Sequence, residues 1–309
     1  MSYNKISLEI NERTLTIEID KIGRQADGSA LIRYGDTIMF VSATSKKEMK
    51  GTKPFLPLIV DYRENTYAAG KIPGGFFKRE GRPSEKEILI SRLIDRPIRS
   101  LFPDGYFYDT QIVALLLSAD LENEHETLGI IGASAALYFS DIPFTTPLGA
   151  VKVGCINNEF IINPTVSQLN ENSLNMIVVG TEEGIVVIEA GCKEIGEAKI
   201  IEAVTLAQEH IMKIIKAQKD LYSQLNIKKR EFTAKEIDQN RYRKIEQNFS
   251  SALIEAIQTK DKQLRDEKTK QILDSLLKDI PEENDDEIQE TKECFFQIQK
   301  KLVRDLILN

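Results

Sequence analysis

The sequence is poor in cysteine and has no long hydrophobic run. Its three cysteines, Cys155, Cys192 and Cys294, are far apart, show no Cys-x-x-Cys spacing and have no histidine nearby. This argues against a zinc site or a disulfide framework and is typical of a reducing cytosol. The longest apolar stretch, Ile112–Leu117, is far too short to span a bilayer, and no signal-peptide core follows Met1. We therefore expect a cytoplasmic protein with no membrane partner.

Histidine is equally scarce. His125 stands between Glu124 and Glu126 and is expected on a solvated loop. His210 lies in an amphipathic segment, where a packing or surface role is expected. Neither histidine is a good candidate for catalysis or for metal binding.

The remaining composition is that of a soluble globular protein. With 309 residues, 41% of them hydrophobic and 29% charged, the chain is long enough for two domains. Its net charge of −7 by itself disfavours a nucleic-acid partner, but the distribution of charge matters more than the sum. From Lys71 to Arg99 there are eight Lys and Arg residues and only four acidic ones. Positive charge is thus concentrated in one zone of an acidic protein.

Within this zone, the run Phe76–Pro83 reads Phe-Phe-Lys-Arg-Glu-Gly-Arg-Pro and follows three glycines, Gly70, Gly74 and Gly75. Aromatic rings offer stacking surfaces to nucleobases, and neighbouring cations neutralise the phosphates of the same strand. The run therefore favours a contact with single-stranded nucleic acid on a mobile loop. The alternative is a buried Phe pair beside a solvated charge run.

Periodicity predicts an α+β arrangement in the first two thirds of the chain. Ser84 and Glu87 form a capping box for a helix to about Asp95, which Pro97 should kink or end. A small-residue helix is expected at Gly129–Phe139, packed closely on a sheet. Alternating or buried apolar runs predict strands at Ile6–Ile10, Leu15–Ile19, Ala30–Tyr34, Thr37–Ser42, Thr110–Ser118, Ala150–Ile156, Glu159–Asn163, Met176–Gly180 and Ile185–Glu189.

From Glu194 to about Leu225 the apolar residues recur at the helical period. After Lys228-Lys229-Arg230 there is no convincing strand, and amphipathic helices are expected at 234–248, 250–277 and 286–308. We therefore predict an α+β domain at residues 1–225 and a small all-α domain at residues 226–309.

Arg92, Arg96 and Arg99 are spaced i, i+4 and i+7, so an unbroken helix would place them on one face. A stripe of arginines can bind several phosphates. The alternative is a solvated face that pairs with Glu85 and Asp95.

Six segments form a pattern when they are taken together: Gly23–Ala30, Tyr67–Ser84, Arg92–Arg99, Ile131–Leu137, Asn163–Thr165 and Val179–Thr181. This pattern resembles that of the polynucleotide phosphorylase family. The central segment is long and ungapped, and the likeness weakens only in the helical tail.

The resemblance implies a fold and an activity. Members of this family have two RNase PH-like domains in tandem, joined by an all-helical domain and followed by two RNA-binding modules. They form ring-shaped homotrimers and degrade RNA from the 3′ end, using inorganic phosphate and a divalent metal such as Mg²⁺ and releasing nucleoside diphosphates. This chain is similar to the first RNase PH-like domain (β-α-β type) plus the all-α domain, and it stops about where the second, catalytic domain would begin.

The resemblance also implies site residues. In this family the Phe-Phe-basic loop lines the channel that admits RNA, so Phe76 and Phe77 are expected to stack bases or constrict the aperture. Lys78, where the family commonly has Arg, would hold the RNA backbone together with Arg79 and Arg82. Arg92, Arg96 and Arg99 are weaker candidates, for a degenerate phosphate site or for inter-domain ion pairs.

By comparison with the catalytic domain of the family, this chain lacks the reacting groups. A Ser-rich loop there precedes the helix similar to Gly129–Phe139, whereas Glu124 and Glu126 here would repel phosphate. The family's Asp-x-Asp-x-Lys pattern corresponds to 173–177, Ser-Leu-Asn-Met-Ile, with both carboxylates and the lysine missing. We expect no catalytic residue and no metal ligand in this chain.

The leading hypothesis is therefore an RNA-guiding and assembly part of a 3′-5′ phosphorolytic exoribonuclease, inactive by itself. Its expected partners are single-stranded RNA, further copies in a homotrimer and components of RNA-degradation complexes, with no DNA partner. Two alternatives stay open. One is a self-sufficient single-domain phosphorolytic RNase, and the other is a structural trimerisation module with no RNA role.

Overall fold

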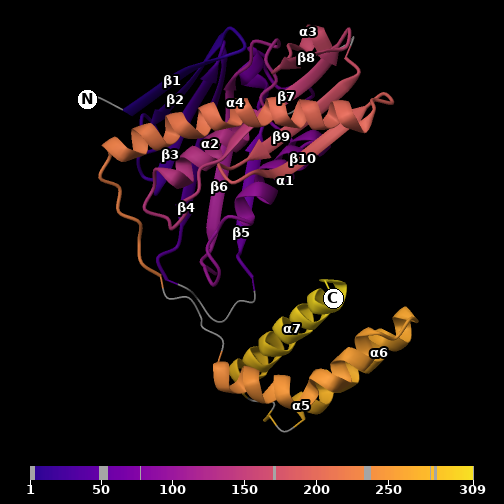
Figure 1. Ribbon diagram of the computed structural model, residues 1–309. Coiled ribbons are helices and arrows are strands. Elements are labelled where there is room, and N and C mark those ends of the chain that lie inside the picture. The colour runs from indigo at the N-terminus through magenta and orange to yellow at the C-terminus, as the bar shows by residue number, and fades with distance from the viewer. Residues whose placement is uncertain are drawn as a thin grey trace. The chain divides into compact units, whose positions relative to one another are not determined.

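The structure is a computed structural model that describes residues 4–48, 55–76, 78–169, 172–232, 238–278, 280–281 and 284–308. It divides into two compact units (Figure 1). The first contains two sheets and the helices that pack on them, and ends at Phe232. The second contains three helices. No helix in the described part of the chain is long and apolar enough to cross a membrane.

A six-stranded sheet, with strand order β1-β2-β3-β4-β6-β5, forms one part of the first unit. Its strands are β1 (Asn4–Ile10), β2 (Arg13–Ile19), β3 (Gly28–Tyr34), β4 (Thr37–Ser45), β5 (Leu58–Arg63) and β6 (Thr110–Ser118). All neighbours are antiparallel except β5, which runs parallel to β6 at the edge. The two predicted hairpins are confirmed, and Asn11 and Glu12 both adopt the positive φ that a two-residue turn requires. The edge strand β5 was not predicted.

The second sheet has four antiparallel strands in the order β10-β9-β7-β8. They are β7 (Gly149–Ile156), β8 (Glu159–Ile162), β9 (Leu174–Gly180) and β10 (Ile185–Cys192), and the short helix α3 (Val166–Leu169) follows β8. These strands confirm the apolar runs predicted for this region. The buried faces of β7 and β9 lie in the same core as the first sheet.

Helix α2 (Glu126–Tyr138) lies between the two sheets, in contact with β2, β3, β4 and β6 on one side and with β7 on the other. Nearly all its side chains are buried, as expected for a small-residue helix packed on a sheet, although it begins three residues before the predicted start. A Cβ atom on Gly28 of β3 would lie 2.1 Å from the carbonyl oxygen of Ala136. The long helix α4 (Glu197–Gln224) contacts β7, β9 and β1.

Helix α1 (Glu85–Arg99) begins at the predicted capping box, in which the Ser84 hydroxyl accepts from the Glu87 N–H and the Glu87 carboxylate accepts from the Ser84 N–H. The helix does not end at Pro97, one of the two effects predicted for this residue, but continues through it to Arg99. Pro97 lies in the last turn, where it removes only one intrahelical hydrogen bond, and its ring is buried. A turn of 3₁₀-helix, η1 (Thr66–Ala69), stands between β5 and the segment that leads to α1.

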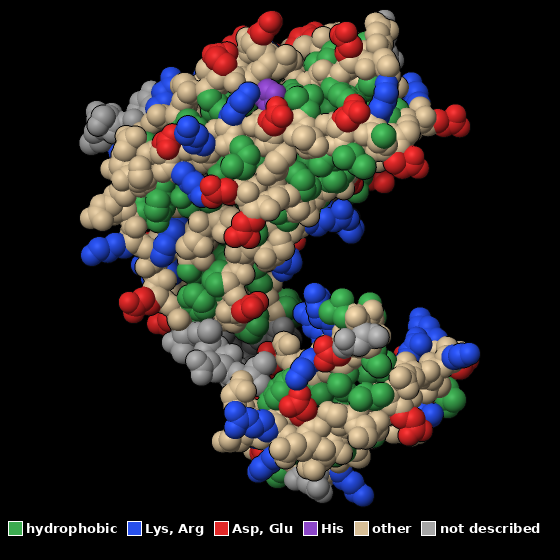
Figure 2. All heavy atoms as spheres, viewed as in Figure 1, with side chains coloured by type: hydrophobic (Ala, Val, Ile, Leu, Met, Phe, Trp, Pro, Cys, Tyr) green, Lys and Arg blue, Asp and Glu red, His purple; other side chains and the backbone are tan. Residues whose placement is uncertain are grey.

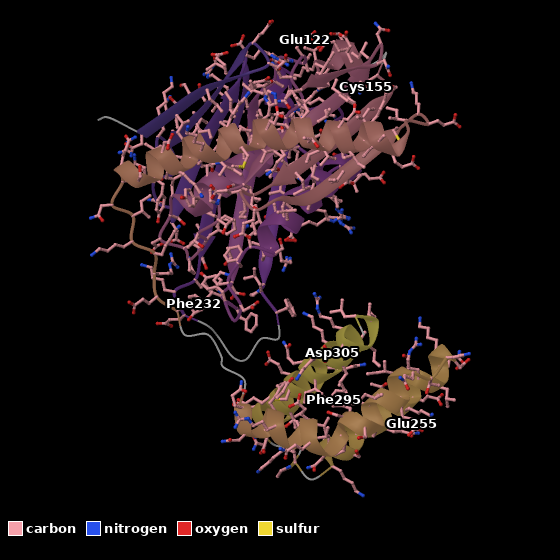
Figure 3. All side chains as sticks on the ribbon, in the orientation of Figure 1. Glu122, Cys155, Phe232, Glu255, Phe295 and Asp305 are labelled. Carbon is pink, nitrogen blue, oxygen red and sulfur yellow. The ribbon has the colours of Figure 1, made fainter. Side chains whose placement is uncertain are left out.

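The second unit consists of α5 (Gln239–Ile257), α6 (Lys262–Leu277) and α7 (Asp285–Leu308). The interruption predicted between two helices near residue 249 is wrong. Helix α5 continues to Ile257, and α6 begins after Asp261, whose carboxylate accepts from the Leu264 N–H as an N-cap. Figure 3 labels Phe295 on α7, which is fully buried at the centre of a small core with Leu253 and Ile298. Figure 2 shows hydrophobic side chains gathered between α6 and α7.

Candidate nucleic-acid interface

Residues 70–83, here called the basic loop, connect η1 to α1 without regular secondary structure. No hydrogen bond or ion pair joins its cations at positions 78, 79 and 82 to another described residue. Phe77 lies outside the described residues. The exposed candidates of the loop are Phe76 (94% exposed), Lys78, Arg79 and Arg82. Burial of Phe76, the alternative interpretation of the run, is therefore excluded.

Two glycines of the basic loop allow backbone conformations that other residues rarely adopt. Gly70 (φ 69°) and Gly75 (φ 76°) adopt left-handed conformations that favour glycine. A Cβ atom on Gly70, Gly74, Gly75 or Gly81 would meet no other heavy atom within 4 Å. There is thus open space beside the backbone at these four glycines.

Two side-chain contacts join the later part of the basic loop to residues of β5 and η1 that precede it. The Glu80 Oε1 atom accepts hydrogen bonds from the Thr66 N–H (2.8 Å) and the Thr66 hydroxyl (2.7 Å). On the next residue, the Gly81 carbonyl accepts from the Arg63 guanidinium at 2.9 Å. Sequence reasoning counted Glu80 only as an acid in the basic zone, because no local pattern links it to Thr66.

Glu64 follows β5 directly and contacts side chains of β5, α1 and the start of α2. Its carboxylate is 2.8 Å from His125 Nε2, accepts from the Tyr62 hydroxyl at 2.9 Å and is 3.1 Å from Lys86 Nζ. Burial alone would raise the pKa of Glu64, but the hydrogen bond and charge of His125 and the charge of Lys86 lower it to about 2. The expectation that His125 is on a solvated loop is wrong: its side chain is 14% exposed and its ring stacks on Tyr62.

Helix α1 carries the three candidate arginines, and the structure gives them different surroundings. Arg99 bonds to Asp95 and donates to the carbonyls of Leu56 and Leu58, so it caps the open edge of β5. Arg96 lies 3.4 Å from Glu189 of β10, a half-exposed pair of little energetic weight.

Arg92 is exposed and forms no hydrogen bond or ion pair with another described residue. It lines a surface groove of about 530 Å³ between β5 and α1, together with Arg63, Ser91 and Asp95. Pro83, at the end of the basic loop, lines the same groove. Of the three arginines, Arg92 is thus the one whose guanidinium is open to a ligand.

The N-terminus of α2 is the place where the family resemblance predicted that Glu124 and Glu126 would repel phosphate. A helix N-terminus attracts anions, but this one already faces the carboxylates of Glu124 and Glu126. Both pair with Lys152 of β7, whose side chain is only 6% exposed. These two carboxylates place negative charge at the helix end, which disfavours an anion there. Lys152 was not predicted, although a single charged residue in an apolar strand is a signal for a buried, paired charge.

The segment 173–177, where the resemblance predicted missing carboxylates, includes the start of β9. Leu174 and Met176 are buried, and Asn175 is exposed and pairs through its backbone with Gly154. Among the described residues, no three His, Cys, Asp or Glu side chains come together in an arrangement that would hold a metal ion. The donor set here does not fit a divalent cation, since Mg²⁺ needs carboxylate ligands.

Three family models match the chain. Residues 11–143 match domain 1 of the 3′ exoribonuclease family, and residues 146–210 match its domain 2. Residues 240–309 match the RNA binding domain of polyribonucleotide nucleotidyltransferase. The first two models together cover most of the first unit, without β1 and the second half of α4, and the third covers nearly all of the helical unit.

Curated relatives agree. The chain is 41% identical over 304 residues to the polyribonucleotide nucleotidyltransferase of Shouchella clausii, with 98% of this chain and 43% of the relative covered. The polyribonucleotide nucleotidyltransferases of Heliobacterium modesticaldum (42%) and Bacillus subtilis (41%) match 97% and 96% of the chain, and 42% of each relative is covered. The chain thus spans less than half the length of these relatives.

Solved structures show the same fold. Rice (Oryza sativa) Rrp46 superposes with a TM-score of 0.53 at 17% identity, covering 66% of this chain and 93% of that one. An Archaeoglobus fulgidus exosome with RNA bound to the active site gives 0.53 at 16% identity, with 70% and 87% covered. The RNase PH-like fold expected from the sequence is therefore confirmed.

Proposed function

Since this chain belongs to the 3′ exoribonuclease family, we propose that it is the RNA-guiding and assembly part of a polyribonucleotide nucleotidyltransferase. The whole enzyme degrades RNA from its 3′ end by phosphorolysis. Residues 1–225 form the first RNase PH-like domain, which is catalytically degenerate, and residues 226–309 form the all-α linker domain.

The observation that carries this proposal is the exposed basic loop. Phe76 offers nearly its whole ring to solvent, and the cations at 78, 79 and 82 are not neutralised by any described carboxylate. Such a surface stacks bases and holds the phosphates of a single strand without reading its sequence. Phe77 completes the aromatic pair in this proposal. Arg92 adds a further contact to phosphate at the neighbouring groove, while Arg96 and Arg99 are weaker candidates because they have protein partners.

The chemistry belongs to another part of the whole protein in this proposal. Inorganic phosphate is the co-substrate and Mg²⁺ the metal of the family enzyme, yet the helix end and the β9 segment of this chain lack the groups to hold either. We therefore assign no catalytic step to this chain. In the cell we place it in the cytoplasm as part of a homotrimer that takes part in mRNA catabolism, together with other components of RNA degradation.

A charge deletion tests the loop. Arg79→Ala should weaken the binding of a single-stranded oligoadenylate by about threefold to tenfold in low salt and reduce the slope of log affinity against log salt by about 0.7, because one phosphate contact is lost. Fluorescence anisotropy of the 309-residue chain measures both quantities. Arg33→Ala, which removes a cation from the exposed face of β3, is the matched control and should change neither.

The alternatives predict different results. A structural trimerisation module would bind RNA equally with and without Arg79. A self-sufficient enzyme would release nucleoside diphosphates from oligoadenylate when phosphate is added to the purified chain. Either outcome would contradict the proposal.

A further inference from the structure

Glu80 is the one acidic residue among the cations of the basic loop, and its surroundings are unexpected. A carboxylate beside Arg79 and Arg82 would ordinarily pair with them or repel an approaching phosphate. Instead, its Oε1 atom accepts two hydrogen bonds from one residue, Thr66, which is fourteen positions away. Both donors belong to η1, which precedes the loop.

Thr66 belongs to a turn of helix that is held to the sheet. It begins η1, in which Ala68 is buried and its carbonyl accepts from the Ala119 N–H at the end of β6 at 2.9 Å. The Thr66 carbonyl also accepts from the Lys71 N–H at 3.1 Å. The η1 turn is therefore held to the sheet by a backbone hydrogen bond, and the start of the basic loop is held to η1 by another.

Residues 78–82, here called the second arm of the basic loop, have no such support. No hydrogen bond links Lys78, Arg79 or Arg82 to another described residue, so its position depends on the two contacts at Glu80 and Gly81. The Arg63 bond to the Gly81 carbonyl and the Glu80 bonds to Thr66 act on consecutive residues. Together they fix both the position and the direction of the backbone immediately after Arg79.

We propose that Glu80 is a positioning residue for RNA: its carboxylate ties the second arm of the basic loop to Thr66 and thereby holds Lys78 and Arg79 in the orientation that receives the strand. The proposal rests on the proposed function, since it assumes that the loop binds RNA. It also explains why an acid is present here, because a carboxylate turned toward Thr66 is withdrawn from the phosphates that the cations bind.

The test depends on the sign of the effect. If Glu80 were merely a negative charge near RNA, Glu80→Ala would remove a repulsion and tighten binding. If Glu80 is the tie, Glu80→Ala should weaken oligoadenylate binding by at least about fivefold, because binding must then order a freed backbone. Glu80→Gln retains an acceptor oxygen for Thr66 and should recover most of the affinity.

Two matched variants complete the set. Glu85→Ala removes a neighbouring exposed carboxylate that has no hydrogen-bonded partner among the described residues, and it should leave affinity equal or slightly higher. Thr66→Val removes the hydroxyl donor and should weaken binding in the same direction as Glu80→Ala, with the double variant no worse than the Glu80→Ala variant alone.

A second measurement separates this inference from the proposed function. Trypsin cleaves after Lys78 and Arg79, and cleavage of the folded chain should become at least about fivefold faster in Glu80→Ala, whether or not RNA binds. Tighter RNA binding or an unchanged cleavage rate in Glu80→Ala would overturn the tie. If cleavage accelerates while Arg79→Ala leaves RNA affinity unchanged, the tie stands as a loop anchor, and both the RNA role of the loop and the positioning role of Glu80 for RNA fail.

Discussion

Glu64 is a residue on which contacts from three elements converge. Its carboxylate contacts Tyr62 on β5, Lys86 on α1 and His125 at the start of α2, and its N–H donates to Glu87 at 2.9 Å. These groups come from three elements, so the charge on Glu64 holds them together. Because the pKa of Glu64 is lowered to about 2, the carboxylate stays ionised through the physiological range.

Glu64→Gln should therefore cost about 3 kcal/mol of unfolding free energy at pH 7. The pKa of Glu64 falls from 4.5 to about 2 on folding, so its contribution is complete above pH 4.5 and disappears as the pH falls from there to about 2. Urea unfolding of both proteins across this range measures the difference, which should shrink toward acid. A difference that stays constant with pH would contradict the assignment, and Glu85→Gln serves as the control.

At the scale of the element, α2 is the helix whose side chains are nearly all buried. It is buried by sheets on both sides, so its packing depends on small residues at the points of closest approach. Gly28, on the facing strand β3, lies so close to the carbonyl of Ala136 that a methyl group cannot be added without moving the helix.

We predict that Gly28→Ala lowers the unfolding free energy by about 1–3 kcal/mol, since added volume in a close-packed core forces the backbone to shift. Gly191→Ala on β10, where an added Cβ atom meets nothing within 4 Å, should have little effect. Chemical denaturation of both variants checks the pair. Equal stability of the two would mean that α2 and β3 are not as closely packed as the structure indicates.

The elements also show how far sequence patterns reach. Strong alternation located the hairpins of β1 to β4, and a side-chain cap located the start of α1, because both signals are local. Strand β5 was missed because an exposed edge strand such as this one, with Ile59 60% exposed, has a weak pattern. The break between α5 and α6 was misplaced because no glycine or proline marks it and Asp261 is an inconspicuous cap.

At the scale of the whole molecule, each unit has a hydrophobic core of its own. The first core joins both sheets with α1, α2 and α4, whereas the second is small and centred on Phe295 between α5 and α7. Two cores that share no buried residue are expected to unfold as separate cooperative units.

Phe295→Ala should destabilise the helical unit by about 3–5 kcal/mol and leave the first unit unchanged, because the cavity is confined to one core. Segment-resolved hydrogen exchange measures this: the amides of α5 and α7 should exchange faster, and those of β2 to β4 should keep their wild-type rates. Phe296→Ala, at a neighbouring side chain that is 55% exposed, is the control and should change little. Faster exchange in both units would show that their stabilities are coupled.

The sequence by itself determined what the basic loop is made of. Adjacent aromatics, cations and glycines need no partner to be recognised, whereas the exposure of Phe76 came from the structure. The absence of carboxylates at 173–177 was also readable, since missing groups cannot be restored by folding.

Only the tertiary structure decided how the groups around the loop are used. It turned Glu80 away from the cations and toward Thr66, buried Lys152 between Glu124 and Glu126, and gave Arg96 and Arg99 protein partners while leaving Arg92 open. The physical reason is that an ionic or hydrogen-bonded pair depends on distance in space. Thr66 and Glu80, or Lys152 and Glu124, are neighbours only after the sheets and helices have packed.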